Sequence, residues 1–234
     1  MMNPQVMAFR ENPPQDEIAR RVAAGVSPNY RGDYTLARNR PANIPAEKNF
    51  SVWITGLPPT VTTHQLLGAI RDVGRVWAAV LSPPTMTNVT AAAKVTFFTA
   101  EAAQTLLARC NGPGPGGLPV GDRIARVQPD RNAVAAATEP IDHTRVISIA
   151  GPTDVVNESY LGAYFSRTFV YEVDEVIWLV AGRAINIIEW RFGSYRCQAQ
   201  WAYERLRQDQ VFLQRGVRVN FERKARGKAS VEVF

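Results

Sequence analysis

The chain has 234 residues, of which 46% are hydrophobic and 21% charged, and its net charge is +6. That apolar fraction is too high for a chain disordered throughout, and the length suits one large domain or two of ordinary size. No apolar run approaches the roughly 18 residues of a membrane-spanning helix, and a secretory signal core is missing at the start. We therefore expect a nuclear or cytoplasmic protein, whose positive charge permits a polyanionic partner without requiring one.

The cysteines and histidines do not have the spacing of a metal site. Cys110 and Cys197 are far apart in the sequence, and His64 and His143 are equally isolated. Isolated cysteines in a chain without a secretory signal are most often ordinary thiols of a reducing compartment. We expect both thiols to be buried, and we expect neither a metal nor another cofactor.

The sequence contains no recognisable catalytic constellation. The segment from Gly112 to Gly117 is rich in glycine, but it follows a helix pattern and lacks the Gly-Lys-Ser/Thr of a phosphate-binding loop, which favours a flexible loop. His64 stands near the start of a predicted helix without a predicted Ser, Cys or carboxylate partner, so a surface or capping role is favoured. We expect no enzyme; a pocket that gathers His64 with a carboxylate would reopen the question.

Residues 1–48 differ in composition from the rest of the chain. They are polar and interrupted by prolines, and we expect them to be mostly disordered, with one helical stretch from Asp16 to Ala24. The β-forming run from Ser51 to Thr55 then marks the start of a folded domain over residues 49–129.

This first domain alternates between strand and helix patterns. In the run from Ala91 to Phe98, every second residue is apolar, which places one face of a strand in the core. The expected elements are strands at 51–55, 76–81, 91–98 and 123–128, a helix from Thr62 or Thr63 to Val73, and a helix at 101–110. The resulting order, β-α-β-β-α-β, is the split-βαβ arrangement.

The same order recurs after a linker at residues 130–144, which has no apolar period. The expected elements of this second copy, residues 145–223, are strands at 145–150, 173–180, 185–192 and 217–221 and helices at 157–167 and 195–208. A basic tail follows at 224–234. The sequence therefore predicts an α+β fold with two tandem ferredoxin-like domains.

Two strand segments of the first copy resemble the motifs of the RNA recognition motif (RRM) family. The run Val52–Leu57 is similar to the family's first-strand motif, with Trp53 at its aromatic position. The run Thr90–Phe97 stands at the third-strand motif, but its two outward aromatic positions are Ala92 and Lys94. The lead-in at residues 39–59 also resembles RRM proteins predicted in fungi.

The resemblance implies a protein that binds single-stranded RNA on the first sheet. Trp53 would stack on a base, Lys94 would contact a phosphate or base edge, and Thr55 and Thr96 would add hydrogen bonds. Arg126 would also contact the RNA, although the pattern of residues around it does not decide which face of the sheet its side chain is on. The facing of Trp77 is open as well, because a bulge in its strand would exchange the two faces.

The second copy departs further from the family pattern. Ser148 replaces the aromatic residue of the first strand, and Ile187 and Glu189 occupy the outward positions of the third. Glu189 would repel phosphate, while outward Ile187 would leave an apolar spot suited to a protein partner. Ser148, Ile187, Glu189 and Arg191 are therefore candidates for partner binding, and the alternative function is a protein-interaction module whose RRM-like folds have lost RNA binding.

Overall fold

The computed structural model describes residues 14–26, 28, 33–36, 42–113, 116–135 and 142–222. The chain divides into two compact units. The first comprises Met1–Val61, Ala69–Arg75 and Leu81–Ala137, and the second comprises Thr62–Gly68, Val76–Val80 and Thr138–Phe234. None of the helices in the described residues has the length and apolarity that crossing a membrane requires.

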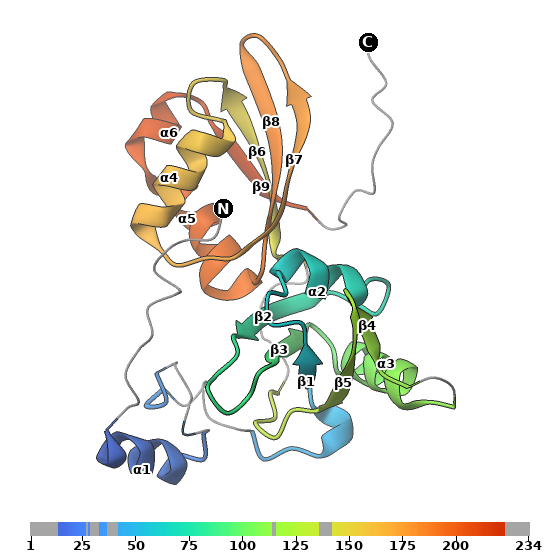
Figure 1. The fold of residues 1–234 in the computed structure, drawn as a ribbon. Coiled ribbons are helices and arrows are strands. Elements are labelled where there is room, and N and C mark those ends of the chain that lie inside the picture. Colours follow the sequence, from blue (N-terminus) through green and yellow to red (C-terminus); the bar gives the residue numbers. More distant parts are fainter. Residues whose placement is uncertain are drawn as a thin grey trace. The chain divides into compact units, whose positions relative to one another are not determined.

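The first β-α-β-β-α-β array forms a sheet with the strand order β2-β3-β1-β5-β4 (Figure 1). Its strands are β1 (Ser51–Leu57), β2 (Val76–Ser82), β3 (Ala91–Phe97), β4 (Leu118–Val120) and β5 (Arg123–Pro129). Its helices are α2 (Thr63–Ala69) and α3 (Ala100–Asn111). The predicted elements are all present, and the short strand β4, which was not predicted, pairs antiparallel with β5.

Alternation along β1 and β3 separates a buried face from an outer face. Val52, Ile54, Val95 and Phe97 are fully buried, and α3 packs against β1, β3 and β5. Side chains on successive strand residues point to opposite faces. The residues between the core positions, beginning with Trp53, therefore belong to the outer face of this sheet.

Helix α2 begins at a capping box and ends earlier than predicted. The Thr62 hydroxyl accepts a hydrogen bond from the Gln65 N–H, and the Gln65 side chain accepts one from the Thr62 N–H. The helix ends at Ala69 rather than at Val73. Gly68 weakens the helix near this point, and Asp72 adopts a φ of 62°, which a continuing helix does not allow.

The second array has the strand order β7-β8-β6-β9. Its strands are β6 (Val146–Pro152), β7 (Val173–Ala181), β8 (Ile185–Phe192) and β9 (Arg218–Phe221), and its helices are α4 (Glu158–Thr168), α5 (Gln200–Gln208) and the short α6 (Gln210–Gln214). The Phe165 ring of α4 packs edge-on against the Trp190 and Phe192 rings of β8, at centroid distances of 5.2 and 5.6 Å. This aromatic cluster forms the core beneath the second sheet.

The segment before α5 corrects two predictions. A continuous helix was predicted from residue 195, but Tyr195–Ala199 forms a wide turn in which Arg196 and Cys197 have non-helical dihedral angles. Cys197 adopts a φ of 61° and is exposed. The prediction that both cysteines are buried is therefore wrong for Cys197, whereas it is confirmed for Cys110.

The N-terminal segment contains the predicted helix as α1 (Gln15–Ala23), stabilised by ion pairs such as Arg21–Glu17 at 3.0 Å. A short 3₁₀ turn, η3 (Ala46–Lys48), precedes β1. About half of residues 1–48, which were expected to be disordered, lie outside the described residues, as do the centre of the Gly112–Gly117 loop and the basic tail.

Candidate nucleic-acid interface

Trp53 lies at the centre of the outer face of the first sheet. It belongs to β1, which has β3 on one side and β5 on the other, and its direct cross-strand neighbours are Lys94 and Gln128. The side chain is half-buried, whereas the residues on either side of it, Val52 and Ile54, are fully buried in the core. The structure thus places an accessible indole on the sheet surface.

Arg126 is on the same face as Trp53. It pairs directly with Thr55, which is paired on its other side with Ala92, and directly opposite residues share a face. Arg126 is exposed, while its neighbours Ala125 and Val127 are buried. This register settles the facing that the sequence had left open, and it places the Arg126 guanidinium two residues along the sheet from the tryptophan.

Lys94 is also on this face, but its charge is already paired. Its Nζ lies 2.5 Å from Oδ2 of Asp130 and donates a hydrogen bond to the backbone carbonyl of Asn132. Asp130 is itself held by Asn49 and Ser51. A phosphate would have to compete with this carboxylate for Lys94, whose predicted contact with RNA stays a prediction.

Thr96 does not contribute to the accessible surface. It is paired with Ser51, and both side chains are buried, with 4% and 1% of their surfaces exposed. The segments before β1 and after β5 meet beside this pair, since the Phe50 N–H bonds to the Val134 carbonyl. Thr96 is therefore buried in this structure, and its hydrogen bond to RNA stays a prediction.

Trp77, whose facing was left open, contacts residues of the second unit to which it belongs. The Arg196 guanidinium lies 5.4 Å from its ring centroid, within the range of a cation–π contact. The burial of β2 does not alternate cleanly. Trp77 is thus engaged by Arg196 and is not counted among the stacking positions.

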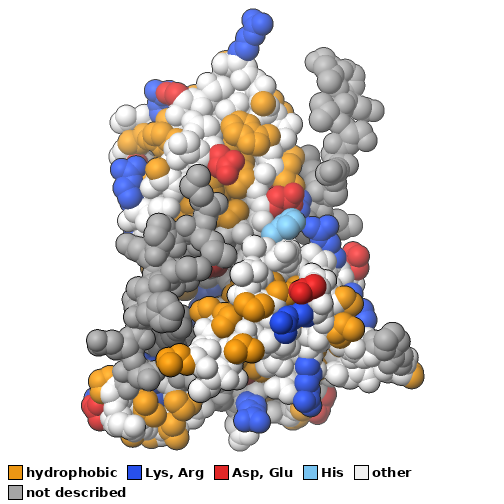
Figure 2. Space-filling model, in the orientation of Figure 1, with side chains coloured by type: hydrophobic (Ala, Val, Ile, Leu, Met, Phe, Trp, Pro, Cys, Tyr) orange, Lys and Arg blue, Asp and Glu red, His pale blue; other side chains and the backbone are white. Residues whose placement is uncertain are grey.

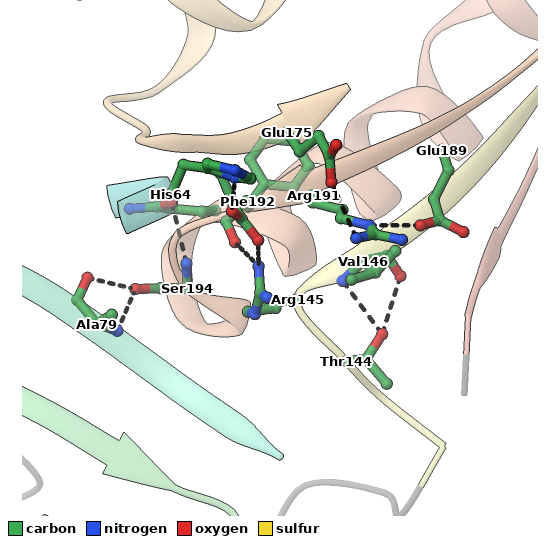
Figure 3. A network of polar contacts seen from close by, with 12 residues as sticks. His64, Ala79, Thr144, Arg145, Val146, Glu175, Glu189, Arg191, Phe192 and Ser194 are labelled. Atoms are coloured by element: carbon green, nitrogen blue, oxygen red, sulfur yellow. Dashed lines mark hydrogen bonds and ion pairs between the residues drawn. The ribbon is translucent and has the colours of Figure 1, made fainter. Parts of the chain in front are cut away.

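Two of the four candidate residues of the second sheet, Glu189 and Arg191, form a polar cluster with Glu175 (Figure 3). Glu189 is fully buried and accepts a 2.5 Å hydrogen bond from Nε of Arg191, whose Nη1 bonds to Glu175. The Glu189 carboxylate is thus buried and paired with Arg191, and its predicted repulsion of phosphate stays a prediction. Ser148 and Ile187 are half-buried, and of the four candidates only these two remain accessible.

His64 has the carboxylate partner that the sequence did not predict. Within the second unit its Nδ1 lies 2.9 Å from Oδ1 of Asp174, whose Oδ2 accepts a hydrogen bond from Arg145 (Figure 3). Nearby, the Ser194 hydroxyl donates to the Ala79 carbonyl and accepts from the Ala79 N–H. Arg145 also donates to the backbone carbonyl of Phe192. These bonds join residues 62–68 and 76–80 to β7 and to the end of β8.

Two shallow hollows stand out on the described surface, and neither includes His64. The larger one, of about 330 Å³, is bordered by Arg126, Ile124 and the buried Cys110, whose pKa is raised by burial. The other lies along α5 between Tyr203 and Gln208. No group of three or more His, Cys, Asp or Glu side chains in the described part of the chain could hold a metal ion.

Basic side chains are dispersed on the surface seen in Figure 2, where Lys and Arg appear in small groups among hydrophobic and uncharged residues. Such a distribution attracts a polyanion weakly at long range. Specific contacts must then supply most of the binding energy at any one site.

No protein-family model matches the chain, and no curated protein matches it. Its structure is similar to that of the RNA recognition domains 1 and 2 of Sex-lethal from Drosophila melanogaster, with 16% identity, a TM-score of 0.28 and coverage of 74% of this chain and 100% of that one. It is also similar to the first two RRM domains of yeast poly(U)-binding protein Pub1. The identity is 17%, the TM-score is 0.29, and the match covers 74% of this chain and 99% of that one. At these TM-scores the likeness supports no conclusion about ligands.

A third similar structure contains three RNA-binding domains of the yeast splicing factor Prp24, with 9% identity and a TM-score of 0.32, covering 74% of this chain and 62% of that one. The chain's own β-α-β-β-α-β order and strand register establish two RRM-like folds independently of these scores.

The ion pairs of Lys94 and Glu189 were missed by sequence reasoning. The only signal for the second was the i,i+2 spacing of Glu189 and Arg191 on one face of a strand.

Proposed function

We propose that the protein binds single-stranded RNA on the outer face of its first sheet. The observation that carries this proposal is the accessible Trp53 ring at the centre of that face, with the exposed Arg126 on the neighbouring strand. Bases of single-stranded RNA are unstacked and can lie flat on an aromatic ring while Arg contacts the backbone. The two side chains supply both kinds of contact on one rigid surface.

Each residue has a definite role in this proposal. Trp53 stacks on one base, Arg126 pairs with a phosphate or lies against a second base, and the Thr55 hydroxyl between them donates to or accepts from a base edge. Lys94 contacts RNA only when its ion pair with Asp130 breaks. Thr96 has no role in this proposal because it is buried. The RNA-binding module corresponds to residues 49–129, in a protein of the nucleus or the cytoplasm.

A single stacked base supplies limited affinity. Stacking on one aromatic residue contributes about 1–3 kcal/mol, and the first sheet offers one such residue where the family pattern has three. We therefore expect weak binding with little sequence preference, since every base has a flat face.

The test is fluorescence polarisation of labelled random single-stranded RNA with the full chain. Trp53→Ala should weaken binding about 5- to 100-fold, in line with the loss of one stacking contact. Trp201→Ala is the matched control, because Trp201 is 41% exposed on α5 and belongs to the second unit. Equal affinity of wild type and Trp53→Ala, with both folded by circular dichroism, would reject the proposal.

The second candidate function is protein recruitment by the second fold. It is favoured by the absence of an aromatic residue among the predicted outward positions of that sheet, where Ser148 and Ile187 are accessible and Glu189 and Arg191 are mutually paired. If the full chain binds no RNA at low salt, this function becomes the leading one. A pull-down that loses its partner with Ile187→Asp, but not with the exposed-site control Val211→Asp, would then identify the surface.

A further inference from the structure

The outer edge of β7 is an apolar edge of the second sheet. In the strand order β7-β8-β6-β9, β7 has a neighbour on one side only, and Figure 1 shows the β7–β8 hairpin with β7 on its free side. Among the described residues, no other strand pairs with its backbone on that side. Such an edge is normally protected by charged residues, proline or a short length.

The sequence of β7 provides little of that protection. The six residues Val176–Ala181 contain no charge, no proline and no glycine, which is the composition that favours strand-to-strand association. Trp178 and Val180 are 43% and 44% exposed. By register Trp178 shares the face of the buried Ile188, whereas Val180 shares the opposite face with Ile187, so apolar surface is exposed on both sides of the edge.

The charges that flank this run are arranged for self-pairing. Glu175 precedes it with 38% of its side chain exposed, although Glu175 also accepts a bond from Arg191. Arg183 follows it and is exposed. In an antiparallel pair of identical strands related by a two-fold axis, the start of one strand lies beside the end of the other. An axis at Leu179 therefore brings each Arg183 opposite the Glu175 of the second copy.

The irregularities of β7 fit the same axis. A bulge leaves Leu179 outside the ladder with β8, and a second one lies at Asp174. Bulges interrupt pairing locally. With the axis at Leu179, the interruption falls at the centre, and the residues on either side of it pair with their counterparts in the other copy.

We propose that two copies of this chain associate through antiparallel pairing of their β7 strands, which extends the second sheet across the two-fold axis. A second copy is the occupant that fits, because its strand presents apolar side chains to the apolar run and a charge of opposite sign to each flanking residue. The association is independent of RNA binding, since it uses the edge of the second sheet and none of the side chains on the first.

The test is light scattering coupled to size-exclusion chromatography of the full chain after nuclease treatment, over a wide range of protein concentration. The mass should rise with concentration from 25.9 kDa toward twice that value. Trp178→Lys should remain monomeric at every concentration, because it places a charge in the apolar contact. Val211→Lys, at a 48% exposed position on α6, should behave as the wild type.

A second variant tests the register between the two β7 strands and leaves the residues of β7 itself unchanged. Arg183→Glu sets acid opposite acid and should weaken association at least about five-fold, whereas Arg123→Glu, at an exposed position of β5, should leave it unchanged. A wild type that stays monomeric at its highest soluble concentration overturns the proposal. Association that is insensitive to both Trp178→Lys and Arg183→Glu overturns it as well.

Discussion

Lys94 and Asp130 form an ion pair of 2.5 Å that fixes the segment after β5 against the outer face of the first sheet. Asp130 is 8% exposed, and besides Lys94 its side chain accepts hydrogen bonds from the Asn132 N–H and the Ser51 hydroxyl. The lysine that would otherwise face a phosphate is thus used to neutralise a buried carboxylate.

Removing Lys94 should therefore affect stability more than RNA binding. Lys94→Met leaves Asp130 without its cation, and we expect the free energy of unfolding to fall by about 1–3 kcal/mol. RNA affinity should change less than with Trp53→Ala. Urea unfolding and fluorescence polarisation of the same preparations compare the two effects, and an affinity loss that exceeds that of Trp53→Ala would contradict this assignment.

The converse change should strengthen RNA binding. Asp130→Asn keeps the side-chain shape but removes the negative charge and releases Lys94, so we expect affinity to rise by up to about five-fold, equivalent to roughly 1 kcal/mol for a charge near the backbone. The gain should shrink at high salt because the added attraction is electrostatic. An affinity that falls would show that the pair is needed to shape the surface.

Arg126 should determine part of the salt dependence. If it contacts one phosphate, Arg126→Ala should weaken binding for all RNA sequences alike and reduce the slope of log K against log salt by about one. Arg131→Ala, an exposed position after β5, is the control. A loss confined to particular RNA sequences would instead assign Arg126 to a base edge.

The ion pair in the second sheet predicts a strongly non-additive double-mutant cycle. Arg191→Leu leaves the fully buried Glu189 uncompensated and should cost about 3–5 kcal/mol of stability. The double variant Glu189→Leu/Arg191→Leu should recover most of that loss, because no buried charge remains. Chemical denaturation of the two single variants and the double variant gives the coupling energy, and additive effects would exclude a paired role.

Glu172 should make stability depend on pH. Burial raises the pKa of its carboxyl above the ordinary value of 4.5, so the folded state favours the protonated form. The resulting contribution is fully present below the unfolded pKa and is lost as pH rises through the folded one. Glu172→Gln should therefore raise the melting temperature at neutral pH and match the wild type below pH 4.5; a variant less stable at neutral pH would refute this.

The sequence by itself determined the two β-α-β-β-α-β arrays, because period-two and helical apolar patterns are local and their order along the chain leaves few ways to bury the apolar faces. It also placed Trp53 outside the core, since Val52 and Ile54 occupy the inward positions on either side. Local alternation did not resolve Arg126, whose facing depends on register with Thr55.

The tertiary structure alone decided which of the candidate charges are available. Lys94 meets a carboxylate 36 residues away, and Glu189 is neutralised by Arg191 only because both lie on the same face of β8 beside Glu175. His64 meets Asp174 at a separation of 110 residues. Pairings of this kind depend on the packing of distant segments, so residue type and spacing predict where a charge lies on a strand but not whether another charge already neutralises it.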